Sequence, residues 1–324
     1  MALRSRSPRF ASARVGRPLR AAAVGLGLMT AACRVTSHPT EPYAPPPAAR
    51  APADWDAVLA APVDVDVQVV ASAQWAVPRK GLVDLRHPVA KEAGLKNELV
   101  PIVLLVGVIR HPEAGDFIVD TGIDAALAEG ARKGAVRGVA RSALRSMQPL
   151  EPLAELVARQ ELSIAGVLLT HSHFDHVLGL PDLPPQTPIY VGPGELRDRR
   201  KLNGLLHPTM RRLFEGRDPV REIDPATTIA LDPLPAVVDL LGDGSIWGIL
   251  CEGHTQGSMA WLVNAREGPV LLVGDTSHTR WGWEHGVPPG RFTSDHEGNA
   301  RSLERLRAFV DRYPQTRVHV GHEL

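Results

Sequence analysis

The 324-residue sequence has only two cysteines, few aromatic residues and no excess of either charge. Cys33 and Cys251 are too few for a disulfide framework, so a chain of this length is expected to fold around a hydrophobic core. Basic and acidic residues number 36 each, a balance that does not indicate a nucleic acid or an anionic membrane as partner. The apolar run 21–29 is shorter than the ~20 residues that span a bilayer, which excludes it as a membrane-spanning helix.

The N-terminal region is basic and then apolar, with no acidic residue before Glu41. A basic head, a short apolar run and small residues are typical of a secretory signal peptide, predicted here over residues 1–32. The ending Thr30-Ala31-Ala32-Cys33 resembles a bacterial lipobox, in which the cysteine is lipidated. We therefore expect export, as a periplasmic or membrane-anchored lipoprotein that contacts the membrane only through Cys33. Plain secretion and a mitochondrial-type presequence are the alternatives.

The rest of the chain divides into a tether and one domain. Residues 33–62 are rich in Pro and Ala without periodicity, which predicts a semi-extended linker. Residues 63–324 alternate between strand and helix patterns without an internal repeat, which indicates one mixed α/β domain. Within it, residues 195–212 predict a basic helical insertion that is broken near Gly204 and Pro208.

One polar cluster follows the apolar run 164–169, which has the pattern of a buried strand. His171 and His173 are two residues apart, so an extended backbone would point both imidazoles to the same side. Asp175 and His176 follow where the chain should turn. Three imidazoles and a carboxylate within six residues suit a divalent transition metal such as zinc. The alternative is a polar loop whose histidines occur together by chance.

Other apolar strands also end in residues of metal-binding type. Asp120, His254, Asp275 and His322 each follow such a strand, and none is near the first cluster in sequence. Because polar residues at the ends of successive core strands gather at one edge of a sheet, these side chains are expected to form one site with the first cluster.

In this arrangement the chain resembles the metallo-β-lactamase superfamily over residues 63–322. The motifs that carry the resemblance are a complete His-x-His-x-Asp-His box, a Gly-His-Thr-x-Gly turn, a strand ending in Gly-Asp-Thr and a final Gly-His turn; their residues are His171, His173, Asp175, His176, His254, Asp275 and His322. The resemblance implies an α/β fold of the αβ/βα sandwich type, with the metal site at one sheet edge.

The resemblance also implies a ligand set for two metal ions, zinc first, with iron or manganese as alternatives. The ligands form two groups of three with one shared carboxylate: His171, His173 and His254; Asp175, His176 and His322; and Asp275 between them. A hydroxide that bridges the two ions would attack the carbonyl of a lactone or another ester, a small-molecule substrate. Asp120 is expected to support the site without binding metal.

Among two-metal members, the stretch from Asp275 to His278 is most similar to the N-acyl-homoserine lactonase branch. That branch has a tyrosine three residues after the bridging aspartate, where this sequence has His278. His278 could donate a hydrogen bond to the carbonyl or act on the leaving group, and a solvated loop histidine is the alternative. Asp175, Asp275 and His278 are thus the candidate catalytic residues.

Several alternatives remain at this point. A β-lactamase or a glyoxalase-II-like thioesterase could use the same site, and a protein of another class, a non-enzymatic zinc-binding lipoprotein, could use the same ligands. Cys251 is expected to be a buried strand cysteine. Trp281 and Trp283 could line an apolar pocket or pin a long loop to the domain.

Overall fold

The computed structural model describes residues 35–47, 52–198 and 201–324. The predicted signal peptide, residues 1–32, and Cys33 lie outside the described residues. Among the residues that are described, no helix is both long and apolar enough to cross a membrane.

The first sheet has eight strands in the order β1-β8-β7-β6-β4-β3-β2-β5. The long strands β2 and β3 pair antiparallel, and β3 continues through the predicted hairpin into β4. From β4 the sheet continues through parallel pairs to β6, β7, β8 and β1. The strands are β1 Thr40–Tyr43, β2 Asp66–Pro78, β3 Leu99–His111, β4 Gly115–Val119, β5 Gln148–Pro149, β6 Ile164–Leu168, β7 Ile189–Val191 and β8 Val220–Ile223.

The second sheet has six strands in the order β14-β13-β12-β11-β10-β9. Neighbouring strands in this sheet are antiparallel except for β13 and β14, which pair parallel. This last pair brings the end of the chain back into the sheet. The strands are β9 Ile229–Leu231, β10 Leu234–Asp239, β11 Ile246–Leu250, β12 Met259–Val263, β13 Val270–Leu272 and β14 Arg317–His319.

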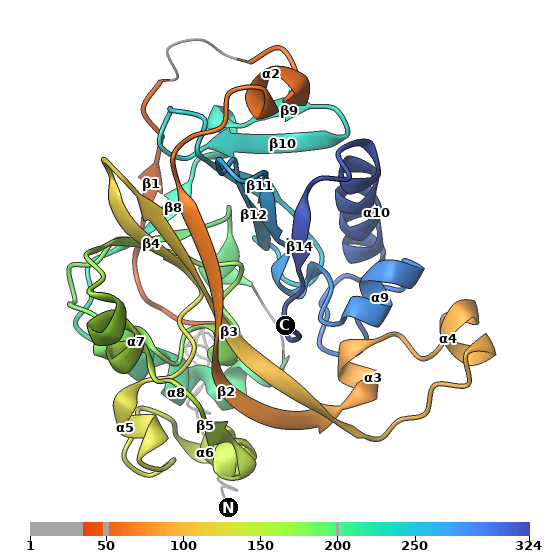
Figure 1. Cartoon of the computed structure of the whole chain (residues 1–324). Coiled ribbons are helices and arrows are strands. Elements are labelled where there is room, and N and C mark those ends of the chain that lie inside the picture. The colour runs from red at the N-terminus through yellow and green to blue at the C-terminus, as the bar shows by residue number, and fades with distance from the viewer. Residues whose placement is uncertain (1–34, 48–51, 199–200) are drawn as a thin grey trace, which may run out of the picture.

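Helices cover the outer faces of the two sheets, with α7 and α10 on opposite sides of the molecule (Figure 1). The long helix α10 turns Leu303, Leu306 and Phe309 inward against the second sheet. The helices are α2 Trp55–Leu59, α3 Arg79–Leu82, α4 Pro88–Glu92, α5 Ala125–Ala128, α6 Gly138–Ala143, α7 Leu153–Gln160, α8 Lys201–Leu213, α9 Arg280–His285 and α10 His296–Arg312.

The facing sides of the two sheets form a continuous apolar core. Phe117 and Leu168 of the first sheet pack in the same cluster as Trp261 and Leu272 of the second. Because each sheet also buries its other face under helices, the layers run helix, sheet, sheet, helix. The predicted αβ/βα sandwich is confirmed.

The segment predicted as a tether is part of the fold where it is described. β1 pairs with β8, and α2 buries Trp55 completely between Trp247 and Phe309, with edge-on ring contacts at 5.3 and 5.1 Å. The sequence expectation for residues 33–62 is therefore corrected for these parts. Burial of the large apolar surface of a Trp indole is so favourable in free energy that one such residue anchors an otherwise Pro- and Ala-rich stretch.

The predicted break in the insertion is also absent, since α8 runs through Gly204 and Pro208. A proline inside a helix costs ~3 kcal/mol. Here α8 buries Leu206, Met210 and Leu213 in the apolar core between the first sheet and the helices on its outer face, and this burial offsets the cost of the proline.

Candidate metal centre

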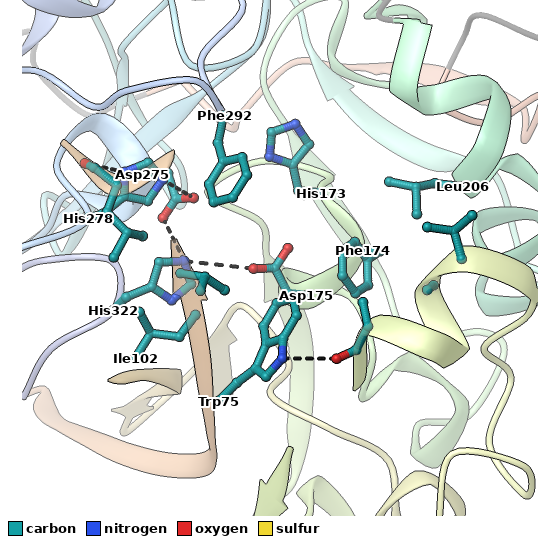
Figure 2. Close-up of a pocket in the computed structure, with 15 residues that line it drawn as sticks. Trp75, Ile102, His173, Phe174, Asp175, Leu206, Asp275, His278, Phe292 and His322 are labelled. Atoms are coloured by element: carbon teal, nitrogen blue, oxygen red, sulfur yellow. Dashed lines mark hydrogen bonds and ion pairs between the residues drawn. The ribbon is translucent and has the colours of Figure 1, made fainter. Parts of the chain in front are cut away.

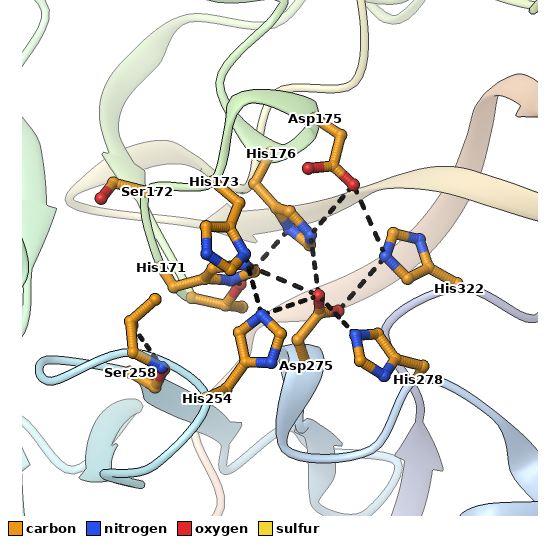
Figure 3. Close-up of polar contacts among 12 residues, drawn as sticks. His171, Ser172, His173, Asp175, His176, His254, Ser258, Asp275, His278 and His322 are labelled. Atoms are coloured by element: carbon orange, nitrogen blue, oxygen red, sulfur yellow. Dashed lines mark hydrogen bonds and ion pairs between the residues drawn. The ribbon is translucent and has the colours of Figure 1, made fainter. Parts of the chain in front are cut away.

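The predicted site residues come from four loops that meet at one edge of the sandwich (Figure 3). The loop after β6 carries His171 and His173, and a short 3-10 helix, Phe174–His176, turns the next two side chains toward the same point. The loops after β11, β13 and β14 supply the remaining members of the sequence prediction, namely His254, Asp275 and His322.

The carboxylate of Asp275 lies at the centre of the cluster. Its Oδ2 atom is 3.6 Å from His171 Nε2, 3.5 Å from His176 Nε2 and 3.3 Å from His254 Nε2. Its Oδ1 atom is 3.3 Å from His322 Nε2. One carboxylate therefore faces imidazoles from both predicted ligand groups, as a bridging ligand would.

The other members complete two neighbouring groups. His173 Nδ1 lies 2.9 Å from His254 Nε2, on the side of His171. Asp175 Oδ2 is 3.7 Å from His322 Nε2 on the opposite side. The possible ligand atoms of each group lie within 4.8 Å of one another, in the sets His171, His173, His254 and Asp275, and Asp175, His176 and His322.

Asp120 orients one of these histidines from behind. Its Oδ1 accepts a hydrogen bond from the Thr170 backbone N–H at 2.8 Å, and its Oδ2 accepts from the Thr170 hydroxyl at 2.8 Å and from His176 Nδ1 at 2.7 Å. With Nδ1 donating outward, the Nε2 lone pair of His176 points into the cluster. Asp120 itself has a φ of 56°, a left-handed conformation that is rare outside glycine and common at functional sites.

His322 is held in the same way although it is the third residue from the C-terminus. Its Nδ1 donates to the Val103 carbonyl at 3.1 Å. Its backbone N–H donates to His278 O, and its carbonyl accepts from Val103 N–H, each at 3.0 Å. These bonds join the last residues to both β3 and the loop after β13.

The charges of the cluster depend on one another. Burial alone would raise the pKa of Asp275, but the surrounding imidazoles, above all His278 and His322, lower it well below its usual value. Burial opposes a charge on His176, yet the carboxylates of Asp120 and Asp275 raise its pKa well above the usual value. Desolvation, reinforced by the neighbouring His176, lowers the pKa of His171. The site holds its carboxylate ionised and at least one imidazole neutral.

The residues present fit divalent metal ions. The Nε2 atoms of His171 and His176 and the Oδ1 atom of Asp275 are buried and have no hydrogen-bond partner. Buried polar atoms without partners are costly, so a group that aims several of them at one point indicates a cation there. Imidazole and carboxylate donors suit Zn²⁺, Fe²⁺ and Mn²⁺.

His278 is buried at the centre, not solvated in a loop. Its side chain is 1% exposed, its Nδ1 donates to the Leu82 carbonyl at 3.0 Å, and its Nε2 lies 3.0 Å from Asp275 Oδ2. The ring is parallel to that of His322, with centroids 5.6 Å apart. The solvated-loop alternative is therefore wrong.

An apolar cavity of about 210 Å³ opens onto the cluster (Figure 2). Its polar end is formed by His173, Asp175, Asp275, His278 and His322, and among the residues that the structure describes no lysine or arginine lines it. The apolar wall comes from distant parts of the chain, namely β2, β3, α3, α6, α8, the loop after β6 and the loop after α9. Its larger members are Trp75, Ile102, Phe174, Leu206 and Phe292.

The two tryptophans considered for this pocket lie elsewhere. Trp283 belongs to the core beneath α10, and Trp281 stacks on His285 with centroids 4.4 Å apart. They anchor α9 to the domain. Other aromatic residues line the cavity in their place, among them Phe174. Its position inside the His-x-His-x-Asp-His box is the sequence feature that could have predicted this role.

A four-layer sandwich with a buried His/Asp cluster at one edge defines a class of metal-dependent hydrolases. The chain belongs to the Metallo-beta-lactamase superfamily, whose family model matches residues 102–322. It is a metal-dependent hydrolase on this evidence.

Relatives point to one part of that superfamily. The N-acyl homoserine lactonase AttM of Azorhizobium caulinodans is 25% identical over 222 residues, which cover 66% of this chain and 80% of that protein. A solved quorum-quenching N-acyl homoserine lactone lactonase has a TM-score of 0.60 at 18% identity and covers 82% of this chain and 94% of its own. An N-acyl homoserine lactone hydrolase with N-hexanoyl-L-homoserine bound at its catalytic metal center has a TM-score of 0.59 at 18% identity, covering 82% and 95%. At such identities the solved structures establish the shared fold.

Proposed function

We propose that this protein is a dinuclear, zinc-dependent lactonase whose substrates carry an apolar acyl chain. The observation that carries the proposal is the cavity, which ends at Asp275 and His322 and, in the described part of the chain, has an apolar wall without lysine or arginine. A neutral lactone head with a hydrocarbon tail matches a polar end and an apolar wall. The lactonases among the relatives support the same substrate class.

In this proposal, His171, His173 and His254 would hold one ion, Asp175, His176 and His322 would hold the other, and Asp275 would contribute to both sites. Two such ions, when bound, supply Lewis acidity toward a carbonyl oxygen and lower the pKa of a shared water. The chain contributes a buried site, a charged Asp275 and imidazoles whose Nδ1 atoms are engaged from behind, as seen for His176 and His322.

His278 is the proposed proton carrier of the reaction. Its Nδ1–H is committed to the Leu82 carbonyl, so Nε2 of the neutral ring is a proton acceptor at the cavity wall. Asp275 Oδ2, 3.0 Å away, stabilises the ring once Nε2 is protonated. The proton that the attacking water loses would pass to Nε2, and from there to the alkoxide that leaves when the lactone ring opens.

The cavity separates this proposal from the other hydrolases on the same fold. A β-lactam and a glutathione thioester both carry carboxylates, and neither would find a lysine or arginine among the described residues of the lining. Metal-reconstituted protein should therefore hydrolyse acyl-homoserine lactones faster than nitrocefin, lactoylglutathione or a phosphodiester. Bound metal without turnover of any of the four would contradict a hydrolase of this kind and favour a zinc-binding lipoprotein.

We further propose that the chain is exported and anchored through a lipid on Cys33, because the sequence around it resembles a lipobox. Cys33→Ala should release the protein from the membrane fraction. Cys251→Ala is the matched control, since Cys251 is buried in the domain, and it should leave the distribution unchanged. Membrane retention of the Cys33→Ala protein would contradict the anchor.

A further inference from the structure

Glu195 is a fully buried carboxylate beside the metal cluster that is not among the predicted ligands. It begins a short 3-10 helix, Glu195–Arg197, which follows β7 after residues 192–194. Burial raises the pKa of its carboxyl group, so the position is costly for a charged residue. A side chain in such a place needs compensating hydrogen bonds, and Glu195 has them on both oxygens.

The partners of Glu195 belong to two different ligand loops. Its Oε1 accepts from the Ser172 backbone N–H at 2.6 Å and from the Ser172 hydroxyl at 2.7 Å. Its Oε2 accepts from the Thr255 hydroxyl at 2.6 Å and from the Gly257 N–H at 3.1 Å. Ser172 stands between His171 and His173 in the sequence, and Thr255 directly follows His254.

The backbones around this carboxylate are packed too closely for any side chain at Gly257. A Cβ atom there would lie 2.8 Å from the backbone N of Glu195 and 2.8 Å from the Gly192 carbonyl oxygen. The end of β7 therefore touches the turn after His254 directly. This contact gives a physical reason for the second glycine of the Gly-His-Thr-x-Gly turn.

We propose that Glu195 is a positioning residue that fixes the distance between the His171/His173 loop and the His254 loop, and thereby the affinity of the first metal site. The loops come from different sheets, β6 from the first and β11 from the second. The hydrogen-bond partners of Glu195 given above are not sequence neighbours of Asp175 or His322. The metal affinity of the second site should therefore not depend on Glu195. The inference rests on the metal assignment of the proposed function but not on its substrate.

The structure offers a matched control in Asp182. Its Oδ2 likewise accepts two backbone N–H bonds, from Ala125 at 2.9 Å and Ala154 at 3.0 Å. These bonds join the starts of α5 and α7 and do not contact a ligand loop. Asp182 is half-buried, and Asp182→Asn removes a structural carboxylate that accepts backbone N–H bonds away from the cluster, so a general loss of stability should be seen in both variants.

The experiment measures metal affinity in single-site backgrounds of the full chain. His322→Ala leaves the first site and His173→Ala leaves the second, and competition with a chelator for Co²⁺ gives the dissociation constant of each. Glu195→Gln should weaken the first site 10- to 100-fold, the usual effect of losing a supporting hydrogen bond, and change the second less than threefold. Asp182→Asn should change neither.

Equal weakening of both sites, or of neither, would overturn the positioning role. If Glu195→Gln does not fold, Thr255→Val removes the hydroxyl donor alone, and it should weaken the first site more than the second. The same variants separate this inference from the proposed function. A background that binds no Co²⁺ contradicts the metal assignment, whereas normal binding with no lactone turnover contradicts only the substrate.

Discussion

If the protein is the proposed lactonase, the volume of the cavity determines how the rate of hydrolysis depends on the length of the acyl chain. Its volume of about 210 Å³ has room for about seven non-hydrogen atoms at roughly 30 Å³ each. Each buried methylene contributes about 0.8 kcal/mol, which corresponds to about a fourfold change in rate. In a series of acyl-homoserine lactones, kcat/KM should therefore rise about fourfold per methylene until about seven chain atoms are bound, and then level off.

Leu206→Ala tests whether this cavity is the one that binds the chain. Leu206 lines the wall, and its loss frees space for about three further carbon atoms at roughly 30 Å³ each, so the plateau should move to longer chains by about that number. The matched control is Leu205→Ala on the same helix, since Leu205 is 58% exposed and outside the lining. The reasoning would be refuted if kcat/KM of the native protein did not depend on chain length. It would also be refuted if Leu206→Ala and Leu205→Ala showed the same dependence.

Three other changes have defined outcomes. Asp120→Asn removes the charged acceptor of His176 Nδ1 and should weaken the second metal site by about 10- to 100-fold in a chelator titration; an unchanged affinity would contradict its orienting role. Burial raises the pKa of Asp124 to about 6, so the folded state keeps a proton that the unfolded chain releases near 4. This one group lowers the unfolding free energy by about 2–3 kcal/mol between pH 4 and 6, so over that range Asp124→Asn should lose about that much less than the native protein in urea titrations; equal losses would contradict the raised pKa. Burial raises the pKa of Cys251 to about 12, so the folded Cys33→Ala protein, in which Cys251 is the remaining cysteine, should resist maleimide, and Cys251→Ala should keep its metal content; rapid labelling of Cys33→Ala would show that the Cys251 thiol is accessible.

The residues of the His/Asp cluster could be predicted because the sequence patterns that indicate them are local. The box from His171 to His176 spans six residues and directly follows a strand, so its geometry depends on the strand end alone. Asp275 and His322 also stand at strand ends. The structure places all seven predicted ligands in one cluster and also contains the predicted sandwich.

The remaining features depend on contacts between distant residues. His278 is buried because its Nδ1 reaches a carbonyl 196 residues away, and Glu195 reaches Thr255 across 60 residues. Local rules also predicted a break at Pro208 and a tether around Trp55, and in both places core packing determined the outcome. A single sequence does not encode these contacts in any local pattern.

The central claim is that two metal ions act together on a lactone, and a titration of metal-free protein with zinc tests it most directly. Turnover of an acyl-homoserine lactone is measured after each addition. We expect little activity up to one equivalent and a steep rise that ends at two, with no such rise in His173→Ala. Full activity at one equivalent, or none at two, would contradict the account.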